Sequence, residues 1–262
     1  MRHIRVFVQV RGFAAYTRCV TELRRRRQAK PPRSHYWKHL FTPMPTALKE
    51  WAVTVRALAE GEQLVTLRKG GVREPGRHFE LEHRRFFLYP TFDHQAAALV
   101  RESHVPEVGR AIEDATWPDE PPTARMLAGG AEVPQPLSVR IRAWADVAAA
   151  WETSDPSAVE ALSRFHVWSG DYAVKRLKWK PRDPLHVLML RVHLLPRPIT
   201  VKVSDTYLGC RSWIQLEREI AYEGTPVLSD EEFSRARAQI EQLLGQPSIR
   251  AEQPARGGRA GH

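Results

Sequence analysis

The run from Leu185 to Leu195 constrains the fold of this chain more than any other stretch. It reads LHVLMLRVHLL and is apolar on nearly both faces of an extended chain. Strands with two apolar faces lie inside a sheet that is covered on both sides. The run therefore predicts a central strand, and we expect Pro196 and Pro198 to end it because proline cannot donate a backbone hydrogen bond.

The first half of the chain is predicted to open with a β-hairpin. Residues 51–58 alternate between two faces, residues 59–62 have turn chemistry, and residues 64–68 would form the returning strand. A third strand is expected over residues 79–89. Thr91 is a suitable N-cap, so we expect a helix from there to Ser103.

The second half alternates strand and helix signals. Further strands are predicted over residues 137–143, 199–203 and 212–216, and helices around residues 108–115, 158–165, 169–179 and 233–244. Ser229 and Glu232 have the spacing of a capping box before the last helix.

These elements predict an α+β fold with two strand-rich halves and flanking helices. The second half is similar to a PUA-like barrel in its short interleaved strands and helices, and we expect such a barrel by analogy. The expected divisions are a basic extension (1–43), a strand and helix unit (44–104), a proline-rich connection (105–136), an α+β half (137–246) and a disordered tail (247–262).

Positive charge is concentrated at the start of the chain. Residues 1–43 contain eleven of the 40 Lys and Arg residues and one of the 30 acids, Glu22, which leaves 29 of each sign in the rest. The pI near 10.0 therefore describes the first segment and not the body of the protein. A nucleic-acid-binding arm, a targeting peptide and a segment upstream of a start at Met44 are the three interpretations, and we favour the last.

The remaining composition indicates a soluble protein of the cytoplasm. Only Cys19 and Cys210 are present, so no disulfide framework is implied, and no apolar run reaches the ~20 residues that cross a bilayer. We therefore expect no membrane partner. No cofactor is predicted, and the sequence does not indicate an oligomeric state.

Several motifs resemble a bacterial family catalogued as domain of unknown function 1802. They are Leu67-Arg68-Lys69-Gly70-Gly71, Phe79, His83, Phe87-Leu88, Pro90-Thr91, His94-Gln95, His166-Val167-Trp168-Ser169, the run Leu188 to Val192, and Tyr207-Leu208-Gly209-Cys210-Arg211-Ser212-Trp213. The resemblance covers roughly Leu48 to Leu216 and leaves out the first 43 residues, which favours the start at Met44. It implies no activity, because the name of the family records that none is assigned.

The first candidate site is a phosphate site. Arg68 and Lys69 supply cationic side chains beside the backbone N–H groups of Gly70 and Gly71, which is a general way to hold a phosphate. The helix start expected at Thr91, with Gln95 nearby, would add an anion-binding end. These residues predict a binding module for a phosphate-bearing ligand, either nucleic acid or nucleotide.

The second candidate site is catalytic. His83 and His94 would approach each other if the hairpin packs on the following helix, and with nearby carboxylates they would form a metal-assisted hydrolase or nuclease. His78, Glu80 and Glu82 share one face of the expected third strand, where they are either weak metal ligands or a solvated polar face. Whether the chain is an enzyme stays open at this point.

Tryptophans and basic residues in the second half allow two interpretations. They form either a stacking platform for single-stranded nucleic acid or parts of the core beside a solvated helix face. The tryptophans concerned are Trp144, Trp151, Trp168, Trp179 and Trp213, and the basic helix face is residues 175–180.

Overall fold

The computed structural model describes residues 44–69, 81–92, 95, 97–116, 135–179, 181–209 and 211–250. Its strands are β1 (Thr46–Trp51), β2 (Val65–Arg68), β3 (Arg85–Thr91), β4 (Ser138–Thr153), β5 (Leu185–Lys202), β6 (Trp213–Gln215), β7 (Thr225–Pro226) and β8 (Ile249–Arg250). Its α-helices are α2 (Ala52–Glu60), α3 (Val105–Ala115), α5 (Pro156–Ala161), α6 (Gly170–Lys178) and α7 (Asp230–Leu244). Short 3-10 helices are η3 (Ala97–Leu99), η4 (Glu102–His104), η5 (Leu162–Phe165) and η6 (Asp205–Tyr207).

The described strands form one mixed sheet. Its order is β2-β5-β4-β3-β1-β6, with β7 beside β5 and β8 beside β4. Strands β1 and β3 are parallel, whereas the other pairs are antiparallel. Helices accompany this sheet, so the predicted α+β class is confirmed. Strands from both halves of the chain are interspersed in this order, and the two halves therefore share one sheet.

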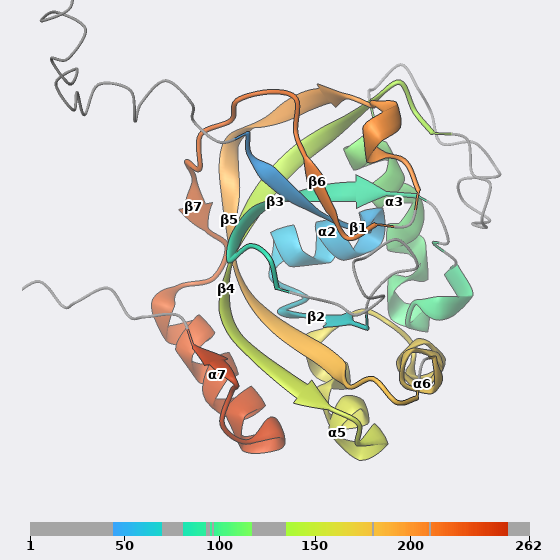
Figure 1. Ribbon diagram of the computed structural model, residues 1–262, viewed down its shortest axis with the longest axis vertical. Helices are drawn as coiled ribbons and strands as arrows, with labels where there is room; N and C mark the ends of the chain where they lie inside the picture. The colour runs from blue at the N-terminus through green and yellow to red at the C-terminus, as the bar shows by residue number, and fades with distance from the viewer. Residues whose placement is uncertain are drawn as a thin grey trace, which may run out of the picture. The chain divides into compact units, whose positions relative to one another are not determined.

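Strands β4 and β5 are the longest in the sheet, and Figure 1 shows them running side by side as two bent ribbons. Their register shifts twice, between Ile141 and Ala143 and between Val147 and Ala149. Bulges of this kind bend a strand and increase its twist. The sheet curls far enough for Arg68 of β2 to contact β1, although three strands separate the two in the sheet order.

The prediction of a central strand at Leu185 is confirmed, but its end is wrong. β5 pairs with β2 on one side and β4 on the other, and it continues past the prolines to Lys202. The register with β4 steps from Leu194 directly to Ile199, so Pro196 and Pro198 lie in a stretch that donates no ladder hydrogen bond. An irregular stretch of this kind is where a strand tolerates proline.

The predicted hairpin is wrong, because residues 52–60 form helix α2 and not a strand. Seven of the nine helical residues are buried, so no polar face marks the 3.6-residue period in the sequence. The apparent alternation over residues 51–58 was therefore not diagnostic. Gly61, with φ of 80°, ends the helix, and β2 then pairs with β5 instead of returning along β1.

The helix start predicted at Thr91 is also wrong. Thr91 is the last residue of β3 and lies opposite Trp51 of β1. Other predicted helix signals are confirmed: α3 covers the expected residues, Ser169 caps α6, and Ser229 with Glu232 forms the capping box of α7. Ile249 and Arg250 pair with β4 as β8, inside the segment predicted to be a disordered tail.

Several predictions concern residues outside the described ranges. They are the basic extension at residues 1–43, most of the proline-rich connection, the tail beyond Arg250, and the candidate residues Gly70, Gly71, His78, Glu80 and His94. Within the described part of the chain, no helix is both long enough and apolar enough to span a membrane.

Candidate functional site at the start of helix α2

Three of the predicted ligand residues come together where β1 passes into α2. Arg68 donates a hydrogen bond from Nη2 to the carbonyl oxygen of Lys49, at 2.7 Å. Gln95 accepts one at Oε1 from the backbone N–H of Val53, at 3.1 Å. Thr91 lies opposite Trp51, the last residue of β1. The sequence therefore identified neighbours of this junction, although it placed the helix start at the wrong residue.

A buried carboxyl group lies at the centre of this region. Glu50, the penultimate residue of β1, is 8% exposed, and its Oε1 lies 3.3 Å from Nε of Arg68. Burial raises the pKa of Glu50, while the positive charges of Arg68 and Arg176 lower it and do not fully compensate. Glu50 therefore keeps its proton to higher pH than an exposed glutamate does.

We call Glu50, Thr66, Arg68, Gln95 and Arg176 the junction cluster. Four of its buried polar atoms have no hydrogen-bond partner at accepted geometry among the residues that the structure describes: Glu50 Oε1, Thr66 Oγ1, Arg68 Nε and Gln95 Nε2. Buried polar atoms are nearly always paired, and an unpaired group calls for a functional explanation or an ordered water. Two of the four atoms, Glu50 Oε1 and Arg68 Nε, form the 3.3 Å ion pair with each other, and the hydroxyl of Thr66 also acts on Glu50, so Gln95 Nε2 is the atom that lacks a described partner.

The first turn of α2 adds positive potential to the cluster. The side chain of Trp51 does not cap the helix, and the turn contains no acidic residue. Backbone N–H groups at a helix start carry a partial positive charge and bind anions. Helix α2 begins at Ala52, directly after Trp51, the residue that pairs with Thr91.

The side chain of Lys69 is buried against helix α6 and does not extend from an exposed loop. It is 3% exposed, and its Nζ donates to the carbonyl oxygen of Leu177 at 2.5 Å. Burial lowers the pKa of Lys69, and Asp183 opposes that effect. The preceding residue in α6, Arg176, donates from Nε to the hydroxyl of Tyr172 at 2.9 Å. Arg176 is half-buried, so the predicted solvated face of this helix is only partly solvated.

Sequence reasoning missed Lys49, Glu50 and Arg176. Lys49 extends from β1 and donates from Nζ to the carbonyl oxygens of Tyr207 at 2.7 Å and Gly209 at 2.8 Å. It thereby fixes the segment that leads into β6. Two consecutive charged residues inside an otherwise apolar run were the available signal, because such residues are rarely buried without a partner or a role.

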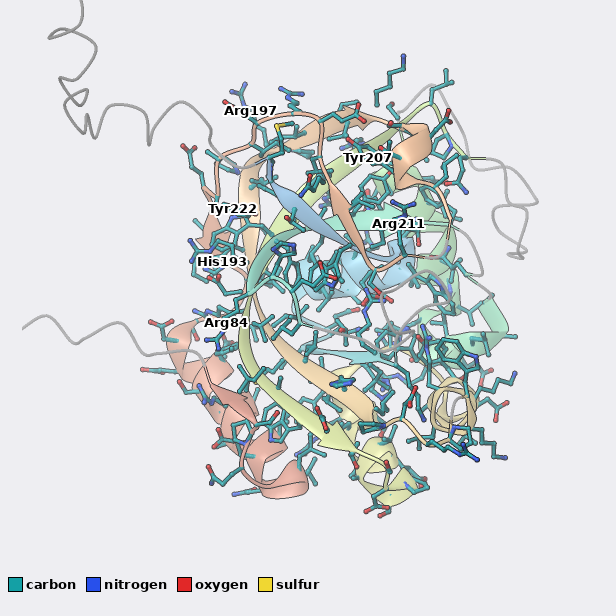
Figure 2. All side chains as sticks on the ribbon, viewed as in Figure 1. Arg84, His193, Arg197, Tyr207, Arg211 and Tyr222 are labelled. Carbon is teal, nitrogen blue, oxygen red and sulfur yellow. The ribbon has the colours of Figure 1, made fainter. Side chains whose placement is uncertain are left out.

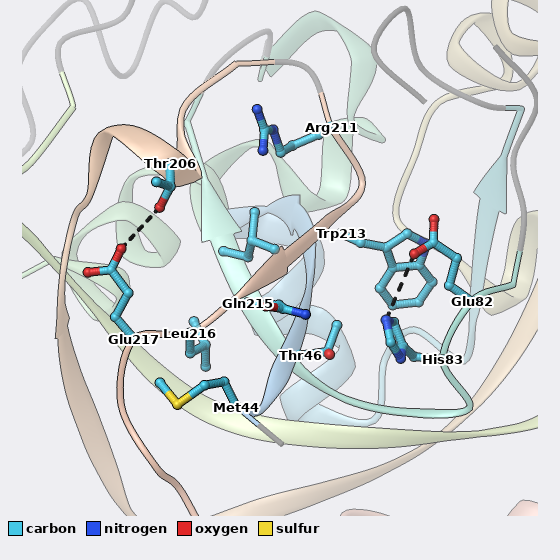
Figure 3. Close-up of a pocket in the computed structure, with 11 residues that line it drawn as sticks. Met44, Thr46, Glu82, His83, Thr206, Arg211, Trp213, Gln215, Leu216 and Glu217 are labelled. Carbon is cyan, nitrogen blue, oxygen red and sulfur yellow. Dashed lines mark hydrogen bonds and ion pairs between the residues drawn. The ribbon is translucent and has the colours of Figure 1, made fainter. Parts of the chain in front are cut away.

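His83 lies apart from the junction cluster, in a pocket over β1 and β6 (Figure 3). The pocket has a volume of about 450 Å³, and Thr46, Arg211 and Glu217 also line it. The ring of His83 meets that of Trp213 edge-on at 5.4 Å, and His83 Nε2 is 3.9 Å from Glu82 Oε2. Arg211, which is labelled in Figures 2 and 3, lines this pocket from the segment before β6.

The described residues contain no group of three or more His, Cys, Asp or Glu side chains that could hold a metal ion. Glu82 and His83 lie together, whereas His78, Glu80 and His94 fall outside the described ranges. The metal-assisted hydrolase built on His83 and His94 therefore stays a prediction.

Most tryptophans of the second half belong to the core. Trp144, Trp151 and Trp168 are buried, and Nε1 of Trp144 and of Trp151 donates to backbone carbonyl oxygens at 2.9 Å. His193 stacks on Trp144 at 3.9 Å, and Tyr222 meets Trp144 edge-on at 5.5 Å. Figure 2 shows His193 and Tyr222 close together. These contacts favour the core interpretation for the three buried rings.

The comparison with protein families matches one family model, described as Domain of unknown function (DUF1802), over residues 47–239. The chain belongs to this family. None of the curated proteins compared with the chain matches it. The family assignment confirms the resemblance seen in the sequence motifs, and it brings no activity with it.

Similar solved structures include the crystal structure of ASCH from Zymomonas mobilis, at 12% identity and a TM-score of 0.34, covering 74% of this chain and 93% of that one. A mutant of the same protein matches at 11% identity and a TM-score of 0.36, covering 75% of this chain and 98% of that one. Because both TM-scores lie below 0.5, these similarities support no statement about the fold or function of this chain.

Proposed function

We propose that the chain binds a phosphate-bearing ligand, a nucleic acid or a nucleotide, with a phosphate group at the junction cluster. The observation that carries this proposal is the ion pair of Arg68 with the buried carboxyl group of Glu50 beside the start of α2, with the positive charge of Arg176 acting on the same carboxyl group. Arginine side chains and helix N-termini are the groups that most often hold phosphate in proteins.

The charge balance of the cluster supports an anionic ligand. The positive charges of two arginines act on a single carboxyl group, and burial raises the pKa of that carboxyl, which reduces its negative charge at a given pH. The positive potential of the helix start adds to this excess. A polar ligand with several acceptor oxygens would also satisfy Nε2 of Gln95, which has no hydrogen-bond partner among the described residues.

The proposal is tested by fluorescence anisotropy of a labelled oligouridylate titrated with the full chain, with UMP as competitor. We expect Arg176→Met to weaken binding by about tenfold to a hundredfold, since a hydrogen bond to a charged group contributes ~1.5–3 kcal/mol. Arg176 is chosen because Arg68 also holds the carbonyl oxygen of Lys49.

Arg235→Met is the matched control, because Arg235 is exposed on α7 and the substitution removes the same charge. Binding should also weaken as salt is added, because phosphate contacts release counterions. Equal loss of affinity in the two variants, or affinity that does not change with salt, would contradict the proposal.

A further inference from the structure

The pocket over β1 and β6, which contains His83, shares no lining residue with the junction cluster. Its volume of about 450 Å³ is within the range of small-molecule sites. Figure 3 shows Gln215 in its centre, with Trp213 on one side and Glu217 on the other. Thr46, the residue paired with Gln215 on β1, also lines the centre. The pocket therefore combines a polar centre with an aromatic side.

The pairing of β1 with β6 places the aromatic ring and the amide on one face of the sheet. Trp213 lies opposite Leu48, and two residues further along β6 Gln215 lies opposite the start of β1. Side chains two residues apart on a strand share a face. Ile214, between them, is 4% exposed and packs in the core on the other face. Because β6 is the last strand in the sheet order, the pocket lies at an edge of the described sheet.

The ring of Trp213 has a fixed orientation. It meets the ring of Phe86 at 5.0 Å and that of His83 at 5.4 Å, with interplanar angles of 70° and 77°. Phe86 is fully buried, whereas Trp213 is half-buried and lines the pocket. An aromatic side chain held in this way is a surface on which flat rings, such as those of nucleobases, stack.

The charges of the pocket do not favour an anion. Among the described residues that line it, Glu82 and Glu217 are acidic and Arg211 is basic. Oε1 of Glu217 accepts hydrogen bonds from the hydroxyls of Ser204 at 2.9 Å and Thr206 at 3.2 Å, so this carboxylate is held within the protein. With two acids to one arginine, the pocket suits a neutral ring better than a phosphate.

The amide of Gln215 distinguishes among neutral rings. It presents an acceptor oxygen beside an NH₂ donor. Adenine presents the matching pair on one edge, the N6 amino donor and the N7 acceptor, and glutamine pairs with both. The ring of a phenylalanine side chain has no polar edge and would leave the amide unused. Stacking on Trp213 and pairing with Gln215 together favour a nucleobase over an aromatic side chain.

We propose that this pocket binds an adenine ring, which stacks on Trp213 and pairs through N6 and N7 with the amide of Gln215. The inference goes beyond the proposed function, because its residues are separate from the junction cluster and no phosphate is needed. Both sites lie on one face of β1, since Leu48, opposite Trp213, is two residues or ~7 Å before Glu50. A single-stranded nucleic acid could thus occupy both.

The test is a two-dimensional NMR titration of the full ¹⁵N-labelled chain with adenosine, which has no phosphate. We expect saturable shifts of the indole N–H signal of Trp213 and of the backbone amide signal of Gln215. Purine riboside, which lacks the N6 amino group, should bind about twofold to tenfold more weakly, the effect of one neutral hydrogen bond. This comparison uses only the native chain.

Gln215→Met should lower the affinity for adenosine to that for purine riboside, and it should leave the affinity for purine riboside unchanged. Gln242→Met is the matched control, because Gln242 is exposed on α7, and it should bind both compounds as the native chain does. If tri-adenylate binds more tightly than AMP, the ligand is a single strand, and if the two bind equally, it is a nucleotide; either result supports the adenine site.

The outcomes distinguish this inference from the proposed function. Equal affinity for adenosine and purine riboside, or no saturable shift at Trp213, overturns the inference. If UMP still shifts the first turn of α2, the proposed function survives that result. If adenosine binds at Trp213 while UMP leaves the first turn of α2 unchanged, the inference stands and the proposed function fails.

Discussion

Replacing Arg68 by methionine should lower the free energy of unfolding of the chain, by an amount that depends on pH. The substitution removes the 2.7 Å hydrogen bond to the carbonyl oxygen of Lys49 and the ion pair to Glu50 at 3.3 Å, both largely shielded from solvent. Removing one partner of a buried pair costs about 3–5 kcal/mol, because the remaining charge is buried without compensation. We expect a loss in this range near pH 8.

The loss should be smaller in acid. Arg68 lowers the pKa of Glu50, so the variant raises that pKa further above its value in the unfolded chain. A carboxyl group with a raised folded-state pKa contributes stability that is present below the unfolded pKa and lost as pH rises through the folded pKa. Near pH 4.5 Glu50 is mostly neutral in both proteins, and the difference should fall to the ~1–3 kcal/mol of an unsatisfied carbonyl oxygen.

Urea unfolding, followed by circular dichroism at the two pH values, measures both losses. The double variant Arg68→Met with Glu50→Gln removes the buried charge as well, and it should recover part of the loss near pH 8. Arg235→Met, on the exposed face of α7, controls for the change in net charge. A loss of unfolding free energy below about 1 kcal/mol, or an equal loss at both pH values, would refute the interpretation of Arg68 and Glu50 as a buried ion pair that joins β2 to β1.

Two further predictions concern buried polar side chains. Burial lowers the pKa of His166 from 6.5 to about 4, so its imidazole is neutral in the folded chain while the unfolded chain takes up a proton below pH 6.5. Stability should therefore fall by about 3 kcal/mol between pH 6.5 and pH 4, and His166→Phe should flatten this part of the profile in thermal unfolding; an unchanged slope would count against it. Gln95→Met removes the acceptor for Val53 N–H and should cost about 1–2 kcal/mol in urea unfolding, whereas no loss would mean that water replaces the amide.

The sequence predicted the elements whose signals are local. The apolar run at Leu185 indicated the central strand, and the spacing of Ser229 and Glu232 indicated the capping box of α7. These signals need only neighbouring residues. Helix α2 was missed because it is buried on nearly every side, which removes the polar face that identifies a helical period. The end of β5 was predicted wrongly because a strand can continue through Pro196 only where the partner strand needs no hydrogen bond from it. That condition is set by the pairing with β4, which is distant in the sequence.

The candidate site was predicted in part. Arg68 and Gln95 were expected beside a helix start at Thr91, which is wrong; their contacts are with Lys49 and Val53, at the junction of β1 and α2. His83 was expected beside His94 in a second candidate site; it lies in the pocket with Trp213, and His94 is outside the described residues. Glu50 was not predicted, because its importance follows from the curl of the sheet that brings β2 onto β1. This contact between β2 and β1 cannot be inferred from a single sequence.

The most direct test of phosphate binding at the start of α2 is a two-dimensional NMR titration of the full ¹⁵N-labelled chain with UMP. The account predicts that the backbone amide signals of Ala52 and Thr54 shift most and saturate together, because these N–H groups lie in the first turn of the helix, where Gln95 already holds the N–H of Val53. Arg176→Met should reduce these shifts, and Arg235→Met should not. Saturable shifts confined to the pocket of Trp213 and Arg211, with the first turn of α2 unchanged, would contradict the account.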